Sequence, residues 1–79
     1  MPLRREEEAA RFVEACVMPA PNREVQAREM YQVYLDWARA NGAAALPMSG
    51  KMFGRIMVGM LDQELRRNVR FYVNVRLRV

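Results

Sequence analysis

Basic side chains are the residues of this 79-residue sequence whose type and spacing suggest a chemical role. Lys51 and Arg55 are four residues apart, which would place them one turn apart on the same side of a helix. Five arginines follow toward the C-terminus. Guanidinium and ammonium groups bind phosphate oxygens, so the pattern predicts contact with a nucleic acid. The predicted contact set is Lys51, Arg55, Arg66, Arg67, Arg70, Arg76 and Arg78.

The distribution of charge along the chain supports this prediction. Residues 1–41 carry six arginines against seven acidic residues, whereas residues 42–79 carry seven basic residues against two acidic ones. The formal net charge of +4 therefore comes from the second half of the chain. A basic half joined to a near-neutral half indicates an oriented surface for a polyanion. The alternative is a solvated basic face, since charges on strands also prevent edge-to-edge aggregation.

Catalytic side chains are scarce in this sequence. With no histidine, one cysteine and one serine, neither a Ser-His-Asp nor a Cys-His set can be assembled. Zinc sites need clusters of cysteine and histidine, so we expect no enzymatic activity, no metal and no cofactor. A lone cysteine forms no internal disulfide, and no apolar run approaches the roughly 20 residues of a membrane span. We therefore expect a cytoplasmic protein that does not enter a membrane.

Three amphipathic segments are expected to position the basic residues. Apolar residues from Ala9 to Val17 recur at helical spacing and predict a leading helix that the two prolines after Met18 terminate. A second helix is expected from Asn22, as its N-cap, to Asn41 and Gly42. A third helix is expected after Ser49, and Gly54 within it predicts a close approach of another helix.

The C-terminal segment alternates between apolar and polar residues from Val69 to Val79, which predicts a half-buried strand. Strict alternation would place Arg70, Arg76 and Arg78 on one wet face. The strand needs a partner, and residues 61–66 would supply it as an intrachain hairpin, with Asn68 in the turn. If residues 61–66 were helical, the strand would pair near Leu46 or with a second chain. The intrachain hairpin allows a monomer, whereas pairing with a second chain gives a symmetric homodimer.

Large apolar side chains are expected to form the core. Tyr31, Tyr34 and Trp37 could stack on bases, but their helical spacing alongside Met30 favours burial. Met57, Met60 and Cys16 are expected inside for the same reason. The predicted core is Phe12, Tyr34, Trp37, Phe53, Ile56, Phe71 and Val73.

Part of the sequence resembles a known family. Met30-Tyr31-Gln-Val-Tyr34-Leu-Asp-Trp37, followed by Asn41-Gly42 and Lys51-Met-Phe53-Gly54, resembles the C-terminal winged-helix domain of phage-, plasmid- and poxvirus-type primase-helicases. Phe12-Val-Glu-Ala-Cys16 is similar to the short leading helix of that family, so the likeness covers about residues 10–79.

The resemblance implies an α+β fold, a small winged helix of three helices followed by a β-hairpin wing. Residues 1–79 would form a single winged-helix-like domain with a leading helix (1–18), a helix-turn-helix (22–60) and a wing (61–79). The third helix and the wing would bind DNA in phage or plasmid replication. The chain departs from the family in having no Gly-x4-Gly-Lys-Ser/Thr loop of the attached helicase, so it would be an excised domain or a stand-alone protein. The turn at Arg67-Asn68 is also shorter than that of the family's wing.

Two other functions are compatible with the same residues. A small phage- or mobile-element-encoded inhibitor or adaptor, such as an anti-defence protein, would apply the basic face to an acidic protein partner. A dimeric transcriptional repressor is the third possibility. DNA binding is the leading hypothesis, and phosphate contacts would make its affinity strongly dependent on salt.

Overall fold

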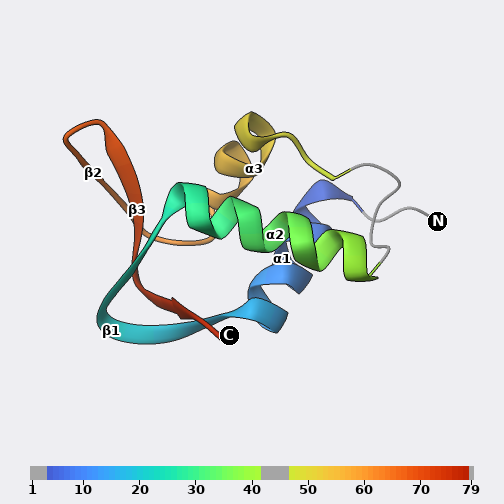
Figure 1. Cartoon of the computed structure of the whole chain (residues 1–79), viewed down its shortest axis with the longest axis horizontal. Coiled ribbons are helices and arrows are strands. Elements are labelled where there is room, and N and C mark those ends of the chain that lie inside the picture. The colour runs from blue at the N-terminus through green and yellow to red at the C-terminus, as the bar shows by residue number, and fades with distance from the viewer. Residues whose placement is uncertain (1–3, 42–46, 79) are drawn as a thin grey trace.

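The computed structural model describes residues 4–41 and 47–78 (Figure 1). The described elements, in chain order, are α1 (Arg5–Cys16), β1 (Val17–Gln26), α2 (Ala27–Asn41), α3 (Gly50–Met57), β2 (Gln63–Arg66) and β3 (Val69–Leu77). The strands form an antiparallel sheet in the order β1-β3-β2, and the helices cover one of its faces. The fold is therefore of the α+β class, as the sequence predicts.

Strand β1 corrects the expected element boundaries. Residues 17–26 pair with β3, so α1 ends at Cys16 and α2 begins at Ala27 instead of after Asn22. The two prolines do not simply end a helix, because they are tolerated on an edge strand, where their missing N–H groups face no partner. Asn22 is not a helix cap; it lies within β1 with a left-handed φ of 67°. The short strand expected near Leu46 lies outside the described residues.

The hairpin of β2 and β3 provides the intrachain pairing that was expected for residues 61–66. Its register runs from Gln63 opposite Tyr72 to Arg66 opposite Val69. Arg67 and Asn68 form the two-residue turn, and both have positive φ values, 49° and 66°. Two central residues with positive φ are the mark of the turn type whose twist matches an antiparallel hairpin. In Figure 1 the end of this hairpin extends beyond the helices.

A break in the β1–β3 register changes which side chains of β3 are buried. Pro19 pairs with Val75 and Glu24 with Val73, so four residues of β1 lie opposite Asn74 alone. Asn74 has a φ of 59°, and its Oδ1 accepts a hydrogen bond from the backbone N–H of Asn22 at 3.2 Å. The alternation therefore shifts by one residue at Asn74.

This shift corrects the expectation of strict alternation. Tyr72 faces the helices before the break, and Val75 and Leu77 face them after it. Phe71 and Val73 are only half-buried and lie outside the buried cluster, contrary to prediction. Arg70 shares the helix-facing side with Tyr72, so it lies on the opposite face from Arg76 and Arg78.

The core lies between the helices and the sheet. Phe12, Tyr34 and Phe53 are at most 2% exposed and pack ring against ring, with centroids 4.8–5.9 Å apart. Trp37 and Ile56 are half-buried and pack against this cluster. Among the remaining predicted core residues, Met57 is fully buried, and Met60 and Cys16 are half-buried.

Helix α3 begins where the sequence predicts. Ser49 is its N-cap, and the Ser49 hydroxyl accepts a hydrogen bond from the backbone N–H of Met52 at 3.2 Å. The expected close approach of another helix at Gly54 is not found. Among the described residues, a Cβ added at Gly54 would meet the guanidinium of Arg70, 3.9 Å away on β3.

Candidate nucleic-acid interface

Helix α3 carries two of the seven predicted contact residues, and a third, Arg70 of β3, lies against this helix. Lys51 and Arg55 are exposed on α3, and together with Ser49 and Met52 they line a shallow hollow. Arg70 from β3 lies beside Gly54 of the same helix. Arg67 is exposed in the hairpin turn. Arg70 is thus brought beside the helix that carries Lys51, 19 positions earlier in the sequence.

These four side chains carry charge that no carboxylate neutralises within the described residues. The salt bridges in residues 4–41 and 47–78 involve Arg5 and Arg66 on the basic side. Lys51, Arg55, Arg67 and Arg70 form none of them. Exposed cations without an acidic partner are available to bind phosphate oxygens.

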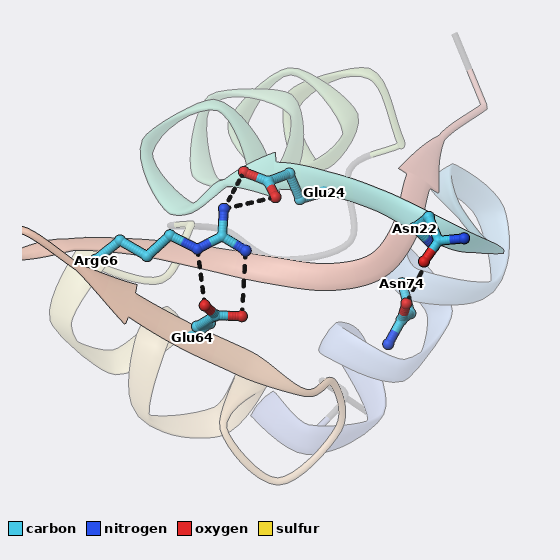
Figure 2. A network of polar contacts seen from close by, with 5 residues as sticks. All are labelled: Asn22, Glu24, Glu64, Arg66 and Asn74. Carbon is cyan, nitrogen blue, oxygen red and sulfur yellow. Dashed lines mark hydrogen bonds and ion pairs between the residues drawn. The ribbon is translucent and has the colours of Figure 1, made fainter.

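Arg66 occupies a different environment from the other arginines of the hairpin. Its guanidinium donates to both carboxylate oxygens of Glu24, at 2.7 and 2.9 Å, and to both oxygens of Glu64, at 2.8 and 3.1 Å (Figure 2). It also lies 5.2 Å from the centre of the Phe71 ring. Glu64 and Glu24 hold the pKa of Arg66 above its ordinary value, and Arg66 lowers the pKa of Glu64.

The consequence is that Arg66 joins the three strands on the face of the sheet away from the helices. Glu24 comes from β1 and Glu64 from β2, while Phe71 lies between them on β3. Two carboxylates already neutralise the guanidinium. Arg66 thus lies on the opposite face of the sheet from Arg70 and is paired with acidic side chains there.

Arg76 and Arg78 lie at the other end of β3. About eight residues separate Arg76 from the hairpin turn, which corresponds to about 25 Å along a strand. Arg76 lines a hollow with Arg23, Glu24 and Glu29, so both basic and acidic groups lie near it. The backbone N–H of Arg78 donates to the carbonyl of Cys16 at 2.8 Å. The structure therefore divides the predicted contact set instead of collecting it on one face.

A buried polar network, which sequence reasoning missed, fixes the start of α3 relative to the other helices. Glu8 of α1 is fully buried, and its carboxylate accepts hydrogen bonds from the Tyr34 hydroxyl and from Arg5, the latter at 2.9 Å. The Tyr34 hydroxyl also accepts from the backbone N–H of Met48 at 2.8 Å. Tyr31 donates to the Met48 carbonyl at 2.7 Å.

This network has an electrostatic effect on Tyr34. Burial and the hydrogen bond to Glu8 raise the pKa of Tyr34 to about 12. Because Met48 immediately precedes the cap of α3, both tyrosines of α2 hold the position at which α3 begins. The sequence did contain a signal: Glu8 is one helical turn before Phe12 and therefore on its buried side.

The aromatic residues of α2 serve the core. Tyr34 is fully buried, whereas Tyr31 and Trp37 are half-buried and pack against the cluster. Base stacking is thus ruled out for Tyr34, because no face of its ring is accessible.

Burial also affects two titratable side chains in other elements. It raises the pKa of Tyr72, which is 1% exposed, while the nearby charge of Arg70 acts in the opposite direction. Burial likewise raises the pKa of the Cys16 thiol.

Two further features of the described residues bear on other classes of function. No three of the histidine, cysteine, aspartate and glutamate side chains in the described ranges are grouped closely enough to hold a metal ion. None of the described helices combines the length and apolarity of a membrane span.

Comparison with known proteins gives no relative of this chain. No family model, no curated protein and no solved structure matches it.

Proposed function

We propose that this protein is a winged-helix module that binds duplex DNA through α3 and the β2–β3 hairpin. One observation carries the proposal: Lys51 and Arg55 are exposed on α3, Arg70 lies beside the same helix, and none of the three forms a salt bridge among the described residues. Helix α3 would enter the major groove, and the hairpin would act as the wing against the backbone. Arg67 and Arg70 would contact phosphates.

The order of the elements supports the proposal. A helix, a strand, two helices and a hairpin follow one another, and the first strand pairs with the last. This order places the hairpin beside the last helix. The strained turn adds to the case, because arginine at a φ of 49° costs energy that asparagine or glycine would avoid. Such strain is found where a side chain is needed for function. A role in phage or plasmid replication rests on the sequence resemblance alone.

The experiment compares two double charge reversals that change the net charge equally. Arg55→Glu with Arg70→Glu takes the formal charge from +4 to 0, and so does Arg76→Glu with Arg78→Glu. Affinity for a short fluorescent duplex is measured by anisotropy at two or more salt concentrations, with circular dichroism to verify folding. The first variant should lose binding, and the second should retain most of it.

The salt dependence gives a second measurement. Removal of one phosphate contact should reduce the slope of log affinity against log salt by about 0.9. Arg55→Gln and Arg70→Gln, taken singly, should each show this reduction. Equal weakening in the two double reversals would mean that only net charge matters. Wild-type protein that binds no duplex at low salt would remove the proposal altogether.

A further inference from the structure

A cleft lies between α3, the first turns of α2 and the hairpin. Its volume is about 270 Å³. That is slightly below the range of about 300–1,000 Å³ that pockets for drug-sized ligands occupy, so a complete metabolite or cofactor would not be enclosed. Its described lining contains one charged side chain, Arg70, and no carboxylate. The lining residues are Ala27, Tyr31, Gly50, Phe53, Gly54, Leu65, Asn68, Arg70 and Tyr72.

Two glycines keep the α3 side of this cleft open. Gly50 and Gly54 are one helical turn apart, and neither has the left-handed backbone conformation that favours glycine. A Cβ at Gly50 would come no nearer than 3.7 Å to the Tyr31 ring, and one at Gly54 no nearer than 3.9 Å to Arg70. Both are ordinary contact distances. Neither the backbone conformation nor the packing therefore requires glycine at these two positions, and alanine would be more favourable in a helix.

One basic side chain lines the cleft, and two more lie on a neighbouring face of α3. Arg70 stands on the hairpin wall. Lys51 and Arg55 each follow a glycine of the cleft, so each is about 100° further around α3, where both line a separate hollow. An occupant of the cleft would meet the positive charge of Arg70 and no carboxylate of the described lining. The chemistry of the cleft therefore favours an anion.

The remaining lining favours an occupant that also has an apolar part. Leu65 is 64% exposed and is thus a large apolar side chain that the core does not use. Tyr31 contributes a half-buried ring to the same cleft. A sugar-phosphate unit combines a negative charge with an apolar ring edge, and as part of a polymer it can enter a cleft too small for a complete ligand.

We propose that this cleft binds one sugar-phosphate unit of a DNA strand, with the phosphate at Arg70, the sugar against Leu65, and the glycines leaving room for the strand. This inference rests on the proposed DNA binding and adds the place at which one strand is held. It also assigns a role to Gly50, Gly54 and Leu65, which carry no charge.

The first test adds methyl groups to the cleft. Gly54→Ala should raise the thermal midpoint because alanine favours the helix, and yet it should weaken duplex binding about threefold. Gly50→Ala together with Gly54→Ala should weaken binding about tenfold. Gly59→Ala is the matched control: it lies outside the lining, and its added Cβ would be 3.6 Å from the Ile56 carbonyl oxygen. It should leave affinity unchanged.

The second test does not depend on glycine. Leu65→Gln should weaken binding several-fold without changing the salt slope, because it removes an apolar contact and no charge. Val58→Gln is its control, since Val58 is 58% exposed and lies outside the cleft. Its affinity should equal that of wild type.

The outcomes separate the two proposals. If wild-type protein binds no duplex, the proposed function fails. If it binds, but the double glycine variant and Leu65→Gln bind as tightly as wild type, the cleft proposal alone is overturned. If the double glycine variant does not fold, the affinity of Leu65→Gln decides the cleft proposal. Wild-type affinity in Leu65→Gln would then overturn the proposal.

Discussion

Replacing Tyr34 by phenylalanine should destabilise this protein more than any other removal of a single hydroxyl group. The Tyr34 hydroxyl donates to the buried carboxylate of Glu8 and accepts from the backbone N–H of Met48. Loss of a hydrogen bond to a charged group costs about 1.5–3 kcal/mol, and a buried N–H without a partner costs about 1–3 kcal/mol. With partial relaxation, we expect a loss of about 3–5 kcal/mol in the free energy of unfolding.

That loss is large relative to the stability of so small a domain. At about 0.05–0.15 kcal/mol per residue, a chain of this length is stable by about 4–12 kcal/mol. Urea denaturation followed by circular dichroism measures the change. Tyr31→Phe is the matched control, because its hydroxyl makes one hydrogen bond, to the Met48 carbonyl, in a part-buried position. We expect about 0.5–1.5 kcal/mol for that control.

A double-mutant cycle with Glu8→Gln tests the reasoning further. The two residues share a buried hydrogen bond, so their effects should be non-additive by about 1 kcal/mol or more. If Tyr34→Phe destabilised the protein no more than Tyr31→Phe did, the buried network would not hold α1, α2 and the start of α3 together.

Three further predictions concern pH, the Arg66 cluster and the turn. The pKa of Tyr34 in the folded protein is raised from 10.0 to about 12, so the contribution of this residue to stability should be complete below pH 10 and lost as the pH rises toward 12. Thermal midpoints measured across this pH range should therefore fall, and they should fall less in Tyr34→Phe. Arg66→Gln should leave the salt slope of DNA binding unchanged, because Glu64 and Glu24 already neutralise its charge; a reduction of about 0.9 would show instead that Arg66 contacts phosphate. Arg67→Asn with Asn68→Gly should stabilise the protein by about 1 kcal/mol in urea denaturation, because these residues adopt the positive φ values of the turn more easily. The same variant should bind DNA more weakly, and unchanged binding would show that Arg67 does not contact the DNA.

Local signals in the sequence predicted the helices and the hairpin well. Apolar residues at helical spacing located α1 and much of α2, and Ser49 capped α3 as expected. The hairpin could be predicted because Val69 begins a long alternating segment that needs a partner strand. These features depend on residues close in sequence, which is why they can be recognised without a structure.

Strand β1 and the break at Asn74 depend on contacts between distant residues. Val17, Ala20 and Val25 are buried at irregular intervals, so β1 shows no alternation, and its prolines suggested a helix end. The shift at Asn74 forms against Asn22, 52 positions earlier, and it exchanges the faces on which the arginines lie. Arg66 and Arg70 lie on opposite faces of the sheet because Leu65 pairs with Arg70 in the hairpin.

Two local conformational costs occur in α3 and in the turn of the hairpin. Gly54 lies within an eight-residue helix, where alanine would be more favourable by about 1 kcal/mol. Arg67 has a left-handed φ at a cost of about 1–2 kcal/mol. Neither cost is offset by packing: a Cβ at Gly54 would fit without a clash, and Arg67 is exposed. Local preferences that conflict with the fold are expected at functional sites. The conflicts at Gly54 and Arg67 therefore favour a functional role for α3 and the hairpin turn independently of their charge.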